Sequence, residues 1–243
     1  MSSKNNGFNI CVPYHGCYTA LRECIGSIFL QTRHIPFKVT VIDDGSPNKE
    51  FFSTIAQMDK QVDGVRFDKQ KGFGAALNAA IKLTEEPWLV FLNSDCVIRE
   101  MDWLLELHHA LESNMKNKVG LVSATMNNGG NSTIVERPRV SERNKSFIMA
   151  DEPMPLICSI APRKLFERVG LFREYPYGCY EDEEFYFRMK SKGYKQGYCE
   201  RSWIEHKGGL TIKALCDDPD IKKIMFEDNR KKCAADISKM LLT

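Results

Sequence analysis

The chain has 243 residues, of which 43% are hydrophobic, and its 34 basic and 32 acidic residues leave a formal net charge of +2. This length and composition suffice for one substantial core, so we expect an independently folding α/β protein. The balanced charge excludes the dense positive surface that nucleic-acid binding requires. The sequence shows no apolar signal core in residues 1–9 and no run of roughly twenty apolar residues, which predicts a soluble protein without a transmembrane segment.

The nine cysteines bear on the compartment. Their number is odd, their spacing is irregular and they include no C-x-x-C pair, which is typical of reduced thiols rather than a disulfide framework or a zinc site. We therefore expect a cytoplasmic protein. Peripheral contact with a membrane and an oligomeric state are both left open.

Apolar runs and helical patterns alternate through the first half of the chain. The first run is stopped by Pro13, and the pattern then changes to helical spacing. The predicted strands are 8–12, 39–42, 65–67 and 88–92, and the predicted helices are 18–31, 48–58, 75–83 and 101–113. Repeated βα units of this kind predict a Rossmann-like, mostly parallel sheet with helices on both faces.

The second half is less regular. The predicted elements are a strand over 119–124, a long polar loop over 126–138, a strand over 153–160, helices over 162–169 and 181–192, and a strand over 197–204. From residue 217 the composition becomes charged and helical, with an irregular apolar stripe. We interpret this tail as a helix that packs on the main body, with an oligomer contact or a membrane-surface helix as the alternatives.

Acidic and polar groups follow two of the apolar runs directly. The turn 43–46 follows one run and the turn 93–95 follows another, while a third acidic cluster occupies residues 181–184. Ligands of open α/β sheets bind beyond the carboxyl ends of the strands, so the first two clusters should face one crevice. A third carboxylate cluster there suggests a metal-assisted reaction on a phosphorylated substrate.

An ordered set of motifs covers residues 8–210: the strand ending at Pro13, Asp43-Asp44-Gly45-Ser46, Lys71–Asn78, Asn93-Ser94-Asp95, Val169–Phe172, Glu181-Asp182 and His206–Gly209. The set resembles the inverting family 2 glycosyltransferases of GT-A fold, with a slight similarity to rhamnosyltransferase-like members. The resemblance implies a nucleotide-sugar-binding half over 1–115, an acceptor-binding half over 116–212 and a helical tail over 213–243.

The resemblance implies nucleotide-binding roles for several groups. Asp44, with Asp43 beside it, would hydrogen-bond the nucleobase, His15 would lie against the base or ribose, and Lys71 would meet the diphosphate. Each has a structural alternative: Asp43 can cap a turn, His15 can be a loop histidine without a ligand, and Lys71 can be merely solvated.

The triplet Asn93-Ser94-Asp95 corresponds to the family's D-x-D motif, which implies a divalent cation, Mn²⁺ or Mg²⁺, at Asp95. Asn93 departs from the usual first aspartate: its amide can still bind the ribose but adds no charge, which weakens metal affinity. His206 would join the metal or the diphosphate. A polar strand-end turn and a structural histidine are the alternatives.

Glu181-Asp182 resembles the family's Glu-Asp pair, in which the aspartate is the general base, so Asp182 is the candidate catalytic residue. The alternative is that the acidic run only favours a helix N-terminus. Arg188, two turns on, is expected to orient the acidic cluster rather than contact substrate. His108 and His109 lie mid-helix and carry no site hypothesis.

The sequence thus predicts an inverting glycosyltransferase of glycan biosynthesis that moves a hexosyl or deoxyhexosyl unit from a nucleoside-diphosphate sugar to a hydroxyl acceptor. One alternative is an inactive nucleotide-sugar- or carbohydrate-binding protein of the same fold. A remote alternative is an NAD(P)-dependent oxidoreductase, because Gly72–Leu77 partly imitates a dinucleotide fingerprint. Leu77 occupies the third small position of that fingerprint, which argues against it.

Overall fold

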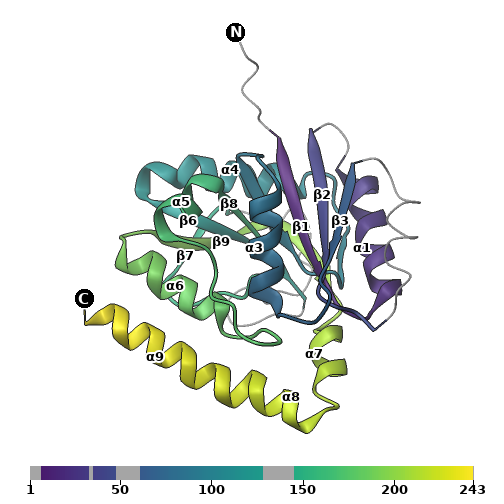
Figure 1. Ribbon diagram of the computed structural model, residues 1–243. Coiled ribbons are helices and arrows are strands. Elements are labelled where there is room, and N and C mark those ends of the chain that lie inside the picture. Colours follow the sequence, from purple (N-terminus) through teal and green to yellow (C-terminus); the bar gives the residue numbers. More distant parts are fainter. Residues whose placement is uncertain (1–6, 33–34, 48–60, 128–144, 243) are drawn as a thin grey trace.

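A computed structural model describes residues 7–32, 35–47, 61–127 and 145–242, which are built around a nine-stranded sheet (Figure 1). The strands are β1 (Phe8–Tyr14), β2 (Phe37–Asp43), β3 (Val62–Arg66), β4 (Trp88–Leu92), β5 (Cys96–Ile98), β6 (Val119–Met126), β7 (Ile148–Ala150), β8 (Cys158–Pro162) and β9 (Lys195–His206). Their order is β3-β2-β1-β4-β8-β6-β9-β5, and β7 pairs with β9. The predicted helix over 48–58 and most of the predicted loop over 126–138 lie outside the described residues.

Most strands of the sheet run in one direction. β3, β2, β1 and β4 are mutually parallel, and β8 is antiparallel to both β4 and β6. β6 therefore runs in the direction of the first four strands, and β9 is parallel to β6. The prediction of a mostly parallel sheet is confirmed. The carboxyl ends of β1, β2, β4 and β9 consequently lie at the same edge of the sheet.

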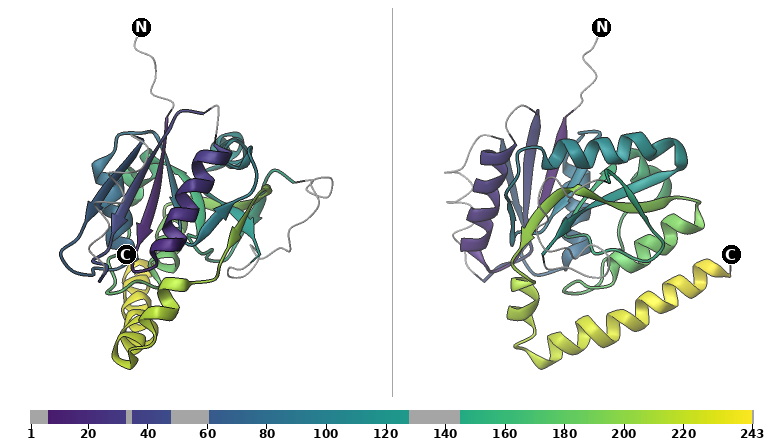
Figure 2. Two further views of the ribbon diagram at one scale, coloured as in Figure 1. Left: turned by 90° about the vertical axis from the view of Figure 1, so that its right-hand side faces the viewer. Right: turned by 180° about the vertical axis from the view of Figure 1, so that it is seen from behind.

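Helices cover both faces of the sheet, as predicted. They are α1 (Tyr18–Gln31), α3 (Phe73–Leu83), α4 (Trp103–Asn114), α5 (Arg163–Val169) and α6 (Glu181–Ser191), and a 3-10 turn, η1 (Met115–Asn117), extends α4. α3, α5 and α6 lie in front of the sheet in Figure 1. The right-hand view of Figure 2 shows the opposite face of the sheet, which α1 (purple) and α4 (teal) cover. Each face carries its own cluster of buried apolar side chains.

The C-terminal tail is helical, as predicted, and consists of α7 (Leu210–Leu215), α8 (Pro219–Lys223), a π-helical turn η4 (Ile224–Asp228) and α9 (Asn229–Leu241). α9 runs along α6 (Figures 1 and 2), and its Asn229 and Cys233 are buried against the segment that precedes α6. The tail therefore packs on the body of the protein. Among the described residues, no helix combines the length and the apolar character that crossing a bilayer requires.

Several element boundaries differ from the prediction. β1 continues through Pro13 to Tyr14. Proline has no N–H to donate, but β1 pairs with β4 only as far as Cys11, so the missing N–H interrupts no hydrogen bond between these two strands. The strand predicted over 153–160 begins only at Cys158, since the prolines at 153 and 155 cannot donate ladder hydrogen bonds. β5 and β7 were not predicted, because three residues are too few for a periodic pattern.

The glycine-rich stretch before α3 packs against the segment that precedes α6. Gly72 has a φ of 106°, and a Cβ at this position would overlap the carbonyl oxygen of Tyr175. A Cβ on Gly74 would overlap the carbonyl oxygen of Arg173. The Asn78 side chain donates to the carbonyl of Phe172 at 2.9 Å and accepts from its N–H at 2.9 Å. These glycines thus permit a close contact between two loops that are a hundred residues apart in sequence.

We expect Gly72→Ala to destabilise the protein by about 1–3 kcal/mol, because the methyl group requires both a left-handed backbone and movement of the 173–178 segment. The matched control is Gly26→Ala in α1, where a Cβ meets nothing within 4 Å. Alanine there should be neutral or stabilising by up to about 1 kcal/mol. Urea unfolding measures both, and equal stabilities for the two variants would contradict the account.

Candidate active site

A cavity of about 510 Å³ opens at the edge where the parallel strands end. The predicted site residues that line it are His15, Asp44, Asn93, Asp95, Asp182 and His206. His15 follows β1, Asp44 follows β2, the 93–95 turn follows β4, and His206 ends β9. The common direction of these four strands explains why groups so distant in sequence meet, and the start of α6 adds Asp182 to the same cavity.

Asp43 and Lys71 are placed differently from the other predicted residues. The Asp43 carboxylate is buried, pairs with the Arg66 guanidinium and accepts the Ser46 N–H at 2.8 Å, so it caps the turn after β2. The Lys71 ammonium lies 4.4 Å from the centroid of the Phe67 ring. Neither residue is part of the cavity lining within the described chain.

The Asp44 carboxylate fixes the glycine-rich turn. It accepts the N–H groups of Lys71 at 2.6 Å and Gly72 at 2.9 Å, one on each carboxylate oxygen. Burial raises the pKa of Asp44 above its ordinary value, although these two N–H groups oppose the rise. His15 lies beside it, with Nδ1 at 2.8 Å from the Asp44 carbonyl oxygen. Asp44 therefore lines the cavity while its carboxylate holds the turn that packs on Tyr175.

Asp95 and His206 form a pair across the cavity floor. β5 pairs with the end of β9 so that Cys96 lies opposite His206, which brings His206 Nε2 to 3.1 Å from Asp95 Oδ1. The other carboxylate oxygen accepts the Leu210 N–H at 3.0 Å. Burial by itself would raise the pKa of Asp95, but the hydrogen bond and charge of His206 and the Leu210 N–H lower it below its ordinary value. Asp95 is thus held as an anion.

The residues around Asp95 suit a hard divalent cation. Ligand atoms of Asp95, Cys96 and His206 all lie within 4.8 Å of one another. Asn93 adds a buried side-chain oxygen that has no hydrogen-bond partner within the part of the chain that the structure describes. Cys96 is a poor ligand, because burial and the nearby Cys24 raise its thiol pKa well above the usual value. A carboxylate, an amide oxygen and an imidazole remain, a donor set that fits Mg²⁺ or Mn²⁺.

Glu181 and Asp182 begin α6 and line the same cavity. Burial and the adjacent Asp182 charge raise the pKa of Glu181, whose buried Oε2 has no hydrogen-bond partner among the described residues. Burial and the charge of Glu183 raise the pKa of Asp182. Asp182 Oδ1 accepts the Glu183 N–H at 2.9 Å. This environment leaves Asp182 a stronger base than an ordinary aspartate.

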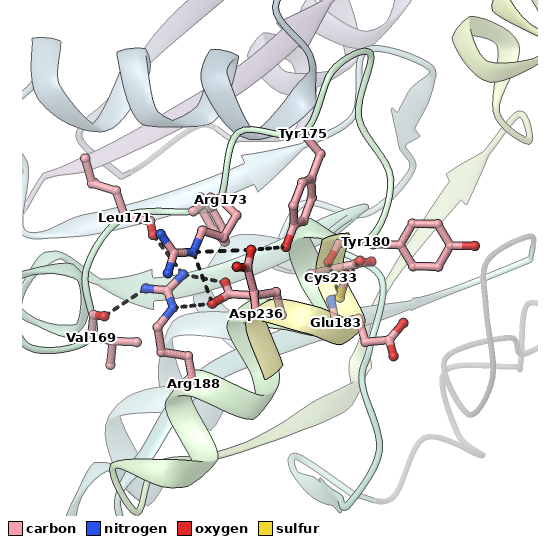
Figure 3. Close-up of polar contacts among 12 residues, drawn as sticks. Val169, Leu171, Arg173, Tyr175, Tyr180, Glu183, Arg188, Cys233 and Asp236 are labelled. Carbon is pink, nitrogen blue, oxygen red and sulfur yellow. Dashed lines mark hydrogen bonds and ion pairs between the residues drawn. The ribbon is translucent and has the colours of Figure 1, made fainter. Parts of the chain in front are cut away.

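Arg188 fixes the acidic helix and lies away from the cavity. Its guanidinium binds the buried Glu184 carboxylate through two hydrogen bonds of 2.8 and 2.7 Å. It also donates to the carbonyls of Val169 and Leu171, both at 2.8 Å (Figure 3). The placement agrees with the predicted orienting role, and the fork geometry of arginine explains how one side chain joins α6 to the 169–171 segment.

The sequence did not indicate the apolar part of the cavity. The tail contributes Ile212, Leu215, Met225 and Phe226, and the segment before β8 contributes 153–157. Leu215 and Met225 are buried, which the mostly charged composition of the tail did not reveal. The only signal in the sequence was the irregular apolar stripe of the tail, which includes Met225. The stripe predicts packing but not a place in the site.

Curated relatives and family models agree on the type of protein. Residues 9–171 match the family model described as Glycosyl transferase family 2. An N-acetylglucosaminyltransferase of Azorhizobium caulinodans is 25% identical over 196 residues, which are 74% of this chain and 49% of that protein. The O-antigen biosynthesis protein RfbC of Myxococcus xanthus is 30% identical over 100 residues, 41% of this chain and 8% of that protein. The chain therefore spans about half the length, or less, of these relatives.

Solved structures share the fold. GalNAc-T7 with UDP, GalNAc and Mn²⁺ has a TM-score of 0.67 at 14% identity, covering 84% of this chain and 44% of that chain. The mannosyltransferase PcManGT of Pyrobaculum calidifontis with GDP-Man and Mn²⁺ has a TM-score of 0.62 at 18% identity, covering 84% and 57%. The family match extends over more than half of the sequence. The chain therefore belongs to glycosyl transferase family 2 and has the GT-A fold of these neighbours.

Proposed function

We propose that the protein is an inverting glycosyltransferase that moves a hexosyl or deoxyhexosyl unit from a nucleoside-diphosphate sugar to a hydroxyl acceptor. The observation that carries the proposal is the single cavity that Asp182 shares with Asp44, Asp95 and His206. A nucleotide-binding group, a site suited to a cation and a raised-pKa carboxylate in one cavity are what this reaction needs. The relative named N-acetylglucosaminyltransferase and the neighbours bound to nucleotides and Mn²⁺ support the same conclusion.

The donor half of the cavity is the part next to the parallel strands. We assign the nucleobase to Asp44, with His15 beside the base or ribose and the side-chain NH₂ group of Asn93 on the ribose, which leaves the Asn93 oxygen for a cation. Asp43 and Lys71 act indirectly, Asp43 by capping the turn and Lys71 by giving its N–H to Asp44. Asn93, Asp95 and His206 would hold a divalent cation, which supplies positive charge for the departing diphosphate when bound.

Asp182 performs the proton transfer in this scheme. The acceptor hydroxyl oxygen attacks the anomeric carbon as its proton moves to the Asp182 carboxylate, and the bond between that carbon and the diphosphate oxygen breaks with its electron pair on the leaving group. The face opposite the diphosphate is attacked, so the configuration inverts. Glu181, whose pKa is raised by burial and by Asp182, retains its proton and spares the site a second negative charge.

The activity is tested by screening nucleoside-diphosphate sugars with Mg²⁺ or Mn²⁺ for thermal stabilisation and for slow hydrolysis. Stabilisation by one donor together with hydrolysis supports the enzyme. Stabilisation without turnover, with every acceptor offered, would favour a binding protein of the same fold. A response to NAD(P) alone would favour the oxidoreductase.

Asp182→Asn should lower kcat by a factor of about a hundred or more, because the amide keeps the shape of the side chain but cannot accept the acceptor's proton. The donor should bind with unchanged affinity, which calorimetry measures. Glu183→Gln on the same helix turn is the matched control and should retain turnover. Wild-type kcat in Asp182→Asn would remove Asp182 from the role of base.

The pH dependence follows from the direction of the Asp182 pKa shift. Burial raises this pKa, so the carboxylate becomes protonated, and kcat falls, at a pH above the ordinary aspartate value of about 4. Glu183→Gln removes a negative charge that contributes to the rise, and so moves the acid limb to lower pH. The measurement is kcat at saturating donor, cation and acceptor. A profile that stays flat down to about pH 4 is the contrary result.

A further inference from the structure

The segment that leads into Asp182 has an unusual backbone. Tyr177, Gly178, Cys179 and Tyr180 have φ values of 64°, 102°, 76° and 73°, so four consecutive residues are left-handed. Three of them carry a Cβ, which makes this conformation unfavourable unless the surroundings hold it. Tyr180 is the residue immediately before α6. The position of Asp182, two residues on, therefore depends on whatever holds this segment.

One side of the segment is held by the glycine-rich turn. A Cβ on Gly72 would overlap Tyr175, and Gly178 packs on Phe73. The turn is itself fixed by the Asp44 carboxylate. These contacts come from residues within 1–115, the half of the chain expected to bind the nucleotide sugar.

The other side is held by the C-terminal tail through Asn229. The Asn229 Nδ2 group donates to the carbonyl oxygen of Pro176 at 2.8 Å and to that of Gly178 at 2.7 Å. Asn229 is fully buried, at 0% exposure. One amide thus satisfies two carbonyls of the segment, of which that of Gly178 is buried, and both would lose this partner if the amide were removed.

Further contacts from α9 surround the segment. The Tyr175 hydroxyl donates to Asp236 Oδ2 at 3.0 Å, and Asp236 also lies 3.9 Å from the Arg173 guanidinium (Figure 3). Burial and the Asp236 hydrogen bond raise the pKa of Tyr175, so the phenol stays a neutral donor. The Cys233 thiol lies 3.6 Å from the carbonyl oxygen of Tyr180. The contacts follow one face of α9 at successive turns.

We propose that the tail is part of the catalytic apparatus and that Asn229 is its main positioning residue, which holds the left-handed segment so that Asp182 meets the acceptor hydroxyl. Asp236, about two turns further along α9, supports the same placement through its hydrogen bond with Tyr175. The inference rests on the proposed role of Asp182. It assigns a function to a region outside residues 9–171, the part that the family model matches.

The test compares point variants of the full chain. Asn229→Ala should lower kcat by about 10- to 100-fold, since a shift of about 1 Å in a reacting group has effects of this size. Donor affinity and binding stoichiometry should stay within about threefold of the wild-type values. The reason is that Asp44, Asp95 and His206, which are proposed to bind the donor, do not lie on α9. Tyr175→Phe removes one oxygen, keeps the buried ring and should show a smaller fall of the same kind.

The matched control is Lys231→Ala. Lys231 is exposed on α9, and among the described residues its one ion pair is the 3.9 Å contact with Asp228. It should keep wild-type kcat and donor binding. Calorimetric stoichiometry reports the folded fraction, so a fall in kcat matched by a fall in stoichiometry would mean that Asn229 serves folding alone and would overturn the proposal. If Asn229→Ala does not fold, unchanged kcat in Tyr175→Phe overturns it.

The proposed base role of Asp182 and the proposed positioning role of the tail can be refuted separately. Unchanged turnover in Asp182→Asn contradicts the proposed function. Loss of turnover in Asp182→Asn, combined with wild-type kcat in folded Asn229→Ala and Tyr175→Phe, leaves that function standing and contradicts the positioning role of the tail.

Discussion

The close contact between the glycine-rich turn and the segment before α6 is the constraint on which the site depends. Asp44 accepts the N–H groups of Lys71 and Gly72, and the absence of a side chain on Gly72 lets this turn reach the backbone of Tyr175. The carboxylate assigned to the nucleobase is thereby linked, through the glycine-rich turn, to the loop that leads into Asp182. Rigid packing of this kind keeps the reacting groups in register.

The acidic groups line one cavity but lie in different local environments. Asp95 receives a hydrogen bond from Leu210 and pairs with His206, which favours its charged form. Glu181 and Asp182 are desolvated and lie beside each other, which favours the neutral form of at least one of them. When their environments push the pKa values of two carboxylates apart, the one with the lower pKa is suited to binding a cation and the one with the higher pKa to accepting a proton.

The sequence predicted those parts of the fold and site that short-range pattern determines. The apolar run over 88–92 marked β4 correctly, and polar residues after β2 and β4 predicted a shared edge because parallel strands end together. The sequence favoured Asp44 over Asp43 for the nucleobase but left open whether Asp43 caps the turn, because that role depends on Arg66, a residue on another strand. The role of Asn229 could not be predicted either, since its partners are carbonyl groups, which every residue possesses.

Convergence of these segments around one donor site is the central claim, and paramagnetic broadening tests it most directly. Mn²⁺ added with a nucleoside diphosphate should broaden the imidazole NMR signals of His15 and His206, which line the cavity, and leave His108 sharp. The His108 ring packs on Phe8 and Trp88, at the starts of β1 and β4 and thus at the opposite edge of the sheet. Asp95→Asn should weaken the effect. Broadening of His108 with a sharp His206 would contradict the account.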